Sequence, residues 1–137
     1  MSTSTRFASI RLIAGDLPAT VAFYQDVTGV RAAWRTDQFA EIRTDGATLA
    51  IAGIATLDLF GTGVAEPAAN RTVFVEFLVP DVDAEFDRLK GSLTDLVQEP
   101  TTMPWGNRSL LFRDPEGTLV NLFTPQTPEA KARFGIQ

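Results

Sequence analysis

The chain contains an internal repeat, in which Ile10–Tyr24 and Val75–Leu89 follow the same pattern 65 residues apart. Each copy has a short apolar strand, a turn residue, an aspartate and then an amphipathic helix. Asp16 and Asp81 hold the same place in the two copies. They suit helix N-caps, because the side-chain oxygen of an aspartate accepts hydrogen bonds from the free N–H groups of a first turn. This repeat constrains the fold most, since both copies are expected to form the same supersecondary unit.

The ends of the two copies also match. Phe39–Gly53 and Ser109–Phe123 each give a strand, a turn that contains an aspartate, a glycine and a second strand. Gly46 and Gly117 are predicted to have positive φ in hairpin turns. One more strand is expected in each copy, around Arg31–Arg35 and Leu96–Glu99.

The sequence therefore predicts an α+β fold made of two βαβββ modules in a single domain of residues 1–137. The first module is expected at residues 7–53 and the second at residues 72–124. Residues 54–71, rich in Gly, Ala and Thr, are expected to link them. Residues 125–137 are expected to form a short terminal helix or a partly ordered extension.

Composition excludes several classes of function. The chain has no cysteine and no histidine, which removes disulfides, thiolate chemistry and the usual general base and metal ligand. A net charge of −5 with scattered basic residues disfavours nucleic-acid binding. No apolar run approaches the roughly 20 residues needed to span a bilayer, so no membrane association is expected. The N-terminal residues lack a signal-peptide pattern, which predicts a cytoplasmic protein.

Arg11 and Glu76 hold equivalent places in the two copies, on strands that we expect to be interior. An unpaired buried charge is costly, so each is expected to have a partner. One interpretation is that they pair with each other. The other is that Arg11 holds an anionic or carbonyl oxygen of a ligand, with Glu76 as an orienting acceptor or base.

Three stretches resemble the vicinal oxygen chelate superfamily, namely "GDLPATVAFYQDVTGV", "PDVDAEFDRL" and "WGNRSLLFRDPEGTLVNLF". This superfamily includes glyoxalase I, extradiol dioxygenases and the fosfomycin- and bleomycin-resistance proteins. The resemblance covers roughly Phe7 to Thr124. It implies that the two modules form an eight-stranded cupped mixed sheet around a ligand cavity, usually completed by a homodimer.

The resemblance also implies where a metal would bind, because metal-dependent members place one ligand on the first and last strand of each module. Those members use His, Glu or Gln there. The matching positions in this chain are Ser9, Ala50, Phe74 and Asn121. Alanine and phenylalanine offer no donor, and one hydroxyl with one amide is too weak a set for a divalent transition metal. We therefore predict no metal site and no cofactor.

The leading hypothesis is a metal-independent protein that binds a small organic ligand in the cup. Strand alternation and the resemblance select the expected ligand contacts, which are Ser9, Arg11, Ile13, Ala50, Phe74, Glu76, Trp105, Leu119, Asn121 and Phe123. One alternative is a metal-free lyase or isomerase, with Glu76 as the acid or base and Arg11 as an oxyanion clamp. Another is an interaction module that uses the paired fold only to dimerise.

Overall fold

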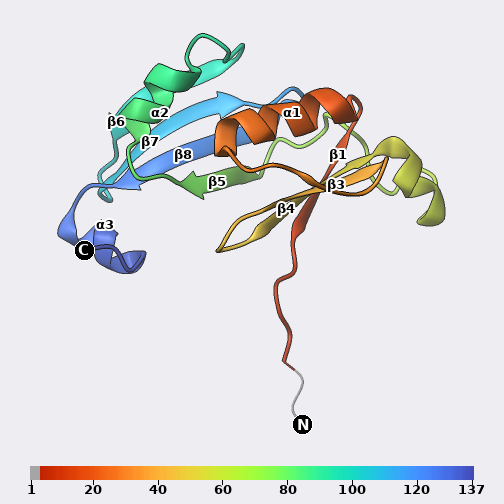
Figure 1. Ribbon diagram of the computed structural model, residues 1–137, viewed down its shortest axis with the longest axis horizontal. Helices are drawn as coiled ribbons and strands as arrows, with labels where there is room; N and C mark the ends of the chain where they lie inside the picture. The colour runs from red at the N-terminus through yellow and green to blue at the C-terminus, as the bar shows by residue number, and fades with distance from the viewer. Residues whose placement is uncertain (1–3) are drawn as a thin grey trace. The chain divides into compact units, whose positions relative to one another are not determined.

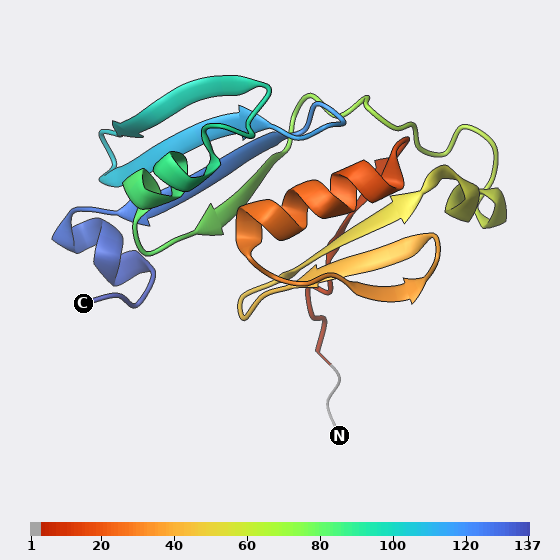
Figure 2. The ribbon, with the colours of Figure 1, turned by 45° about the horizontal axis from the view of Figure 1, so that its top comes forward.

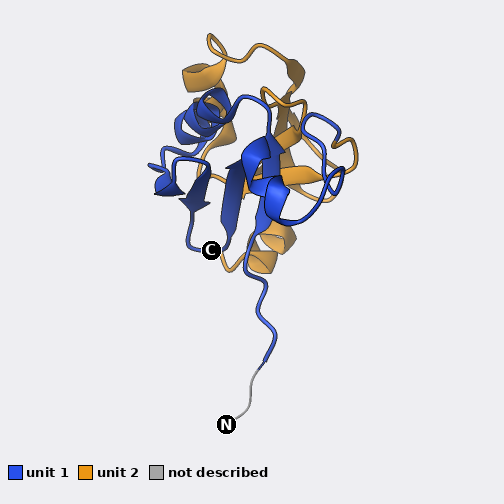
Figure 3. Cartoon of the chain, turned by 90° about the vertical axis from the view of Figure 1, so that its right-hand side faces the viewer, with its two compact units in different colours: residues 1–69 blue, residues 70–137 orange. Residues whose placement is uncertain are grey.

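The computed structural model describes residues 4–137. The chain divides into two compact units, residues 1–69 and residues 70–137 (Figure 3). Each unit contains one copy of the repeat seen in the sequence, and the two are described in turn.

The first unit is a four-stranded sheet with one helix on it. Its strands are β1 (Ile10–Ala14), β2 (Ala33–Thr36), β3 (Phe39–Arg43) and β4 (Thr48–Gly53), in the spatial order β1-β4-β3-β2. β1 pairs with β4 in parallel, and the other pairs are antiparallel. The helix α1 (Leu17–Thr28) lies along one face of this sheet, and the 3₁₀ helix η1 (Ile54–Leu59) follows β4 (Figures 1 and 2).

The helix α1 begins at an aspartate N-cap and ends at a glycine C-cap. Asp16 accepts a hydrogen bond of 3.1 Å from the N–H of Ala19, which confirms the predicted N-cap. Gly29 ends the helix with φ of 70°, a left-handed conformation that glycine adopts without a steric penalty. Val21 and Tyr24 are buried, together with Leu49 and Ile51 of β4. The prediction that Tyr24 belongs to the core is confirmed.

The second unit repeats this arrangement. Its strands are β5 (Phe74–Leu78), β6 (Leu96–Thr102), β7 (Asn107–Arg113) and β8 (Leu119–Pro125), in the order β5-β8-β7-β6, and only β5 and β8 are parallel. The helix α2 (Val82–Leu89) lies on one face, and α3 (Pro128–Arg133) follows β8 (Figure 1). Of the two alternatives predicted for residues 125–137, the structure has the short terminal helix.

Three contacts hold the start of α2 on its sheet. Asp81 caps the helix by accepting from the N–H of Ala84 at 3.2 Å, as predicted. The N–H of Val82 donates to the hydroxyl of Thr124 at 2.9 Å. Arg108 of β7 donates two hydrogen bonds to the carboxylate of Asp83, at 2.9 and 3.0 Å, and these bonds raise the pKa of Arg108 above its ordinary value. Thr124 and Arg108 therefore mark the side of the sheet that faces α2.

In each unit the remaining alternate positions point away from the helix, and we call this side the open face. In the first unit, strand register and alternation assign seven residues to the open face: Arg11, Ile13, Phe39, Glu41, Thr48, Ala50 and Ala52. In the second unit, the same rule assigns to the open face Phe74, Glu76, Leu78, Ser109, Leu111, Arg113, Leu119, Asn121 and Phe123. The predicted alternation along the first and last strands of each copy is confirmed.

One of the two hairpin-glycine predictions differs from the structure. Gly117 has the expected positive φ of 86°, but Gly46 is absent from the positive-φ residues among those described. The turn at Gly46 is closed instead by Thr44, whose N–H and hydroxyl both donate to the carbonyl of Ala47, at 3.0 and 2.8 Å.

The two added strands are present where they were predicted, with somewhat different bounds. β2 begins and ends later than expected, and β6 extends to Thr102. β6 includes Pro100 and has register shifts on both sides of Gln98. It is the last strand in the sheet order, where the missing N–H of a proline is tolerated.

The α+β class and the two βαβββ modules predicted from the sequence are confirmed. The behaviour of residues 1–137 as a single domain, with the module bounds given above, stays a prediction. Within residues 4–137, no helix is long and apolar enough to cross a membrane.

Candidate functional site

A hydrogen bond joins two polar side chains on the open face of the second unit, midway along β5, which ends the strand order, and its neighbour β8. Glu76 of β5 and Asn121 of β8 are direct partners in the parallel ladder. The amide nitrogen Nδ2 of Asn121 donates to Oε2 of Glu76 at 2.8 Å. Because both side chains point away from α2, the pair belongs to the face that the helix leaves uncovered.

This pair leaves hydrogen-bond acceptors free. Asn121 is only 7% exposed, and its carbonyl oxygen Oδ1 is buried without a hydrogen-bond partner in the described structure. Glu76 is exposed, and within residues 4–137 the only hydrogen bond of its side chain is the one that Oε2 accepts. A buried carbonyl without a partner costs about 1–3 kcal/mol, so such a group is commonly completed by a water or a ligand.

Apolar side chains surround the pair. Phe74 and Leu78 lie two positions before and after Glu76 on β5, and they are 51% and 40% exposed. On the inner strands, Leu119 and Leu111 are half-buried on the same face. A few polar atoms within an apolar surround are typical of sites for small organic molecules.

Phe123, another expected ligand contact, is packed against the C-terminal segment. Its ring centroid lies 5.2 Å from that of Phe134, which follows α3, and Phe123 is only 6% exposed. A ligand contact at Phe123 stays a prediction, and in this structure its ring already has an aromatic neighbour.

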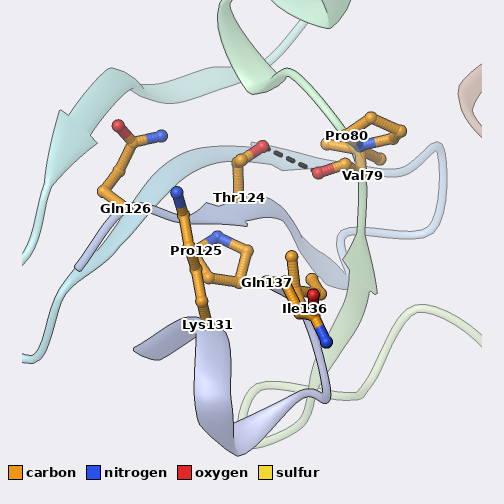
Figure 4. A pocket seen from close by; sticks show the side chains of 8 residues that line it. All are labelled: Val79, Pro80, Thr124, Pro125, Gln126, Lys131, Ile136 and Gln137. Atoms are coloured by element: carbon orange, nitrogen blue, oxygen red, sulfur yellow. Dashed lines mark hydrogen bonds between the residues drawn. The ribbon is translucent and has the colours of Figure 1, made fainter. Parts of the chain in front are cut away.

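A pocket of about 290 Å³ opens beside the C-terminal segment (Figure 4). The hydroxyl of Thr124, at its wall, donates to the carbonyl of Val79 at 2.8 Å. The pocket is lined by Val79, Pro80, Thr124, Pro125, Gln126, Lys131, Ile136 and Gln137. None of these residues is among the predicted ligand contacts.

In the first unit, Arg11 is held by aromatic rings. Its guanidinium carbon lies 4.9 Å from the centroid of Phe39 and 5.8 Å from that of Phe60. Ala50 lies between Arg11 and Glu41 in the ladder, and Ala52 lies between Ile13 and Phe39. These small side chains leave room for the guanidinium to reach across β4 toward β3.

Arg11 and Glu76 thus each have contacts within their own unit. Their mutual ion pair, one of the two interpretations from the sequence, stays a prediction. Among the other expected contacts, Ile13 is half-buried, Ser9 is exposed just before β1, and Trp105 is exposed in the turn between β6 and β7.

Sequence reasoning missed several side chains on the open faces. Glu41 accepts from Arg35 at 2.7 Å and lies on the same face as Arg11. Leu111 lies beside Asn121. The alternation rule, applied to the third strand of each module, would have found both. Phe60 follows η1, in a segment with no periodic pattern, and nothing in the sequence marks its contact with Arg11.

Comparison with known proteins identifies the family. Residues 6–122 match the model of the Glyoxalase/Bleomycin resistance protein/Dioxygenase superfamily, which is most of the chain. The chain belongs to this superfamily. No curated protein matches.

Solved structures of the superfamily fold are similar over nearly the whole chain. A glyoxalase/bleomycin resistance protein/dioxygenase from Nocardioides is 25% identical with a TM-score of 0.72, covering 93% of this chain and 88% of its own. A protein of unknown function from Agrobacterium tumefaciens is 22% identical with a TM-score of 0.77, covering 90% and 96%. A lactoylglutathione lyase from Agrobacterium tumefaciens is 22% identical with a TM-score of 0.67, covering 90% and 96%.

The metal used by many members of the superfamily does not fit the residues of this one. Ala50 and Phe74 have no side-chain atom that could bind a metal, and the amide N–H of Asn121 donates a hydrogen bond to Glu76. The remaining candidates are Oδ1 of Asn121, the Ser9 hydroxyl and the Glu76 carboxylate, and one charged oxygen ligand with two weak neutral ones is a poor set for a divalent transition metal. Within residues 4–137, no three Asp, Glu, His or Cys side chains are grouped so as to hold a metal ion.

Proposed function

We propose that this superfamily member binds a small organic ligand without a metal ion, on the open face of the second unit. The observation that carries the proposal is the buried, unpartnered Oδ1 of Asn121. A ligand that donates a hydrogen bond to this oxygen removes an unfavourable term from the free energy of the folded protein. A hydrogen bond from a ligand to Oδ1 of Asn121 would therefore contribute favourably to the binding free energy.

The surroundings of Asn121 support the same proposal. Glu76 holds the amide in one orientation by the 2.8 Å bond, so the site is organised before a ligand arrives. Phe74 and Leu78 offer exposed apolar surface on either side of Glu76. The superfamily includes bleomycin-resistance proteins, which sequester a drug without catalysis, so binding alone is a known use of this fold.

Metal independence is the part of the proposal that is simplest to test. The purified, tag-free protein is exposed to nickel, zinc, manganese and iron(II), desalted, and analysed for metal by mass spectrometry. We expect metal well below one equivalent per chain. Stoichiometric metal would overturn the argument from Ser9, Ala50, Phe74 and Asn121.

Ligand binding is tested by a thermal-shift screen of a chemically diverse library. A ligand that binds only the folded protein raises its melting temperature in proportion to RT ln(1 + [L]/Kd). Hits are repeated on the Asn121→Leu variant, which removes both the donor to Glu76 and the free oxygen. We expect the shift to be lost in this variant. Hits that shift both proteins equally would place binding elsewhere.

The second candidate is a metal-free lyase or isomerase in which Glu76 is the acid or base and Arg11 clamps an oxyanion. The observation that favours it is the exposure of Glu76, whose Oε1 makes no hydrogen bond within the described residues. A confirmed ligand is incubated with the protein and followed by proton NMR. Conversion that disappears in Glu76→Gln would support catalysis, and an unchanged ligand would leave binding as the function.

We also propose that the protein is a homodimer, as the resemblance implies, and that it is cytoplasmic. Light scattering coupled to size-exclusion chromatography gives the mass directly, against 14.9 kDa for one chain. A monomeric mass at micromolar concentration would contradict the dimer.

A further inference from the structure

We infer that the ligand of the second unit carries an organic cation with adjacent N–H donors, such as an amidinium or a guanidinium, on an apolar body. This inference rests on the proposed function and names the chemical class of the ligand. It follows from which hydrogen-bonding positions at Glu76 and Asn121 are already used and which are free.

The free positions at the site are acceptors. The carboxylate of Glu76 has only acceptor oxygens, and one of them already receives the N–H of Asn121. The other free atom is Oδ1 of Asn121, a carbonyl oxygen, which is also an acceptor. A ligand group that meets both side chains must therefore offer at least two donors. Planar amidinium and guanidinium groups present such donors on neighbouring nitrogens.

The charge at the site favours a cation over a neutral donor. Within the described residues, Glu76 makes no ion pair. Arg113 is the cation that alternation places on the same face, and its Nη1 donates to the carbonyl of Gly117 at 2.9 Å, in the β7–β8 turn. The carboxylate of Glu76 can thus form an ion pair with a cation from outside the unit.

The apolar residues beside the pair favour an apolar or aromatic body. Phe74 and Leu78 stand two residues from Glu76 in each direction along β5, about 7 Å away. Both side chains are substantially exposed. A cation over the face of the Phe74 ring gains a further attraction from the negative face of the ring. An aryl amidine satisfies the donor, charge and apolar requirements together.

The test uses three aromatic probes of nearly the same shape, which are benzamidine, benzamide and benzoate. Each is titrated into the 15N-labelled protein, and the side-chain NH₂ signals of Asn121 and the backbone signals of β5 and β8 are followed. Benzamidine is expected to move these signals with a dissociation constant of about 1 mM or tighter, as suits a ligand of this size. Benzamide is expected to bind at least about tenfold more weakly, and benzoate not to bind there.

Two variants locate the effect. Glu76→Gln keeps an acceptor for Asn121 but loses the charge, and benzamidine is expected to bind at least about tenfold more weakly. Asp87→Asn removes one negative charge from the exposed side of α2, far from the open face in the same unit, and is expected to bind benzamidine like the parent protein. Equal loss in both variants would mean that net charge alone attracts the probe, which would overturn the inference.

The inference and the proposed function fail in different ways. If benzoate or benzamide binds at Asn121 as tightly as benzamidine, the inference is wrong and the binding function stands. If benzamidine leaves the β5 and β8 signals unmoved up to about 10 mM, the inference is also wrong. The thermal-shift screen with Asn121→Leu then decides the binding function independently.

Discussion

The guanidinium of Arg11 lies over the ring of Phe39, 4.9 Å from its centroid, although their strands are not neighbours. β4 runs between them, and at this level of the sheet it carries Ala50 and Ala52. The small side chains on β4 therefore allow a contact between side chains of its two neighbours, β1 and β3. Ala50, which the resemblance predicts at a vacated metal-ligand position, thus has packing contacts in this protein.

Enlarging Ala50 is expected to separate Arg11 from Phe39. In Ala50→Leu, the added side chain competes with the guanidinium for space between β1 and β3. Overpacking of a fully buried position costs about 1–3 kcal/mol of unfolding free energy. Urea denaturation measures this cost, and the control is Ala47→Leu in the exposed β3–β4 turn. Equal stability of the two variants would contradict the packing role of Ala50.

Replacing Asn121 by leucine is expected to leave the protein as stable as the parent, or more stable, while ligand binding is lost. The substitution removes a buried carbonyl without a partner, which costs about 1–3 kcal/mol, and adds apolar volume in its place. Asn107→Leu is the matched control, since Asn107 has the same kind of buried, unpartnered Oδ1 at the far end of β7. It is expected to change stability similarly and to leave binding intact. A large destabilisation confined to Asn121→Leu would show that the Glu76–Asn121 bond has a mainly structural role.

The two hairpin glycines are expected to respond in opposite ways to alanine. Gly117 has φ of 86°, and an alanine forced into the left-handed region costs about 1–2 kcal/mol. Gly46 has no positive φ, and the space that an added Cβ would fill is open. Gly46→Ala is therefore expected to be neutral or to gain about 0.4–1 kcal/mol by restricting the unfolded chain. Denaturant midpoints of the two variants give the comparison. A loss at Gly46 as large as that at Gly117 would show that the turn requires glycine after all.

The ion pair of Asp83 with Arg108 is expected to contribute a small, salt-dependent stabilisation. It joins the first turn of α2 to β7 through two hydrogen bonds, but both side chains are partly exposed. Asp83→Asn is expected to cost about 0.5–1 kcal/mol at low salt. The cost is expected to shrink in 1 M NaCl, where the Debye length is about 3 Å. Asp87→Asn, whose partner Lys90 lies 3.4 Å away at an exposed position, is expected to change stability by less. A loss for Asp83→Asn that is the same at both salt concentrations would assign its role to packing or helix capping.

The sequence alone determined the features that depend on neighbouring residues. Asp16 and Asp81 cap their helices because a cap needs only the first turn that follows it. The alternation along β1, β4, β5 and β8 follows from the geometry of any strand, so the residues of the open faces were predictable there. The repeat of these local signals was sufficient to predict two βαβββ modules.

Tertiary structure decided which open-face side chains meet. Asn121 donates to Glu76 because β5 and β8, separated by 45 residues in the chain, pair in that one register. Arg11 lies over Phe60, and Phe123 over Phe134, because segments without periodic patterns return to the sheets. Gly46 has no positive φ, and its turn carries hydrogen bonds from Thr44 to Ala47 that a glycine pattern does not encode. A local pattern limits the face on which a side chain lies, and its partner depends on strand pairing and packing across the fold.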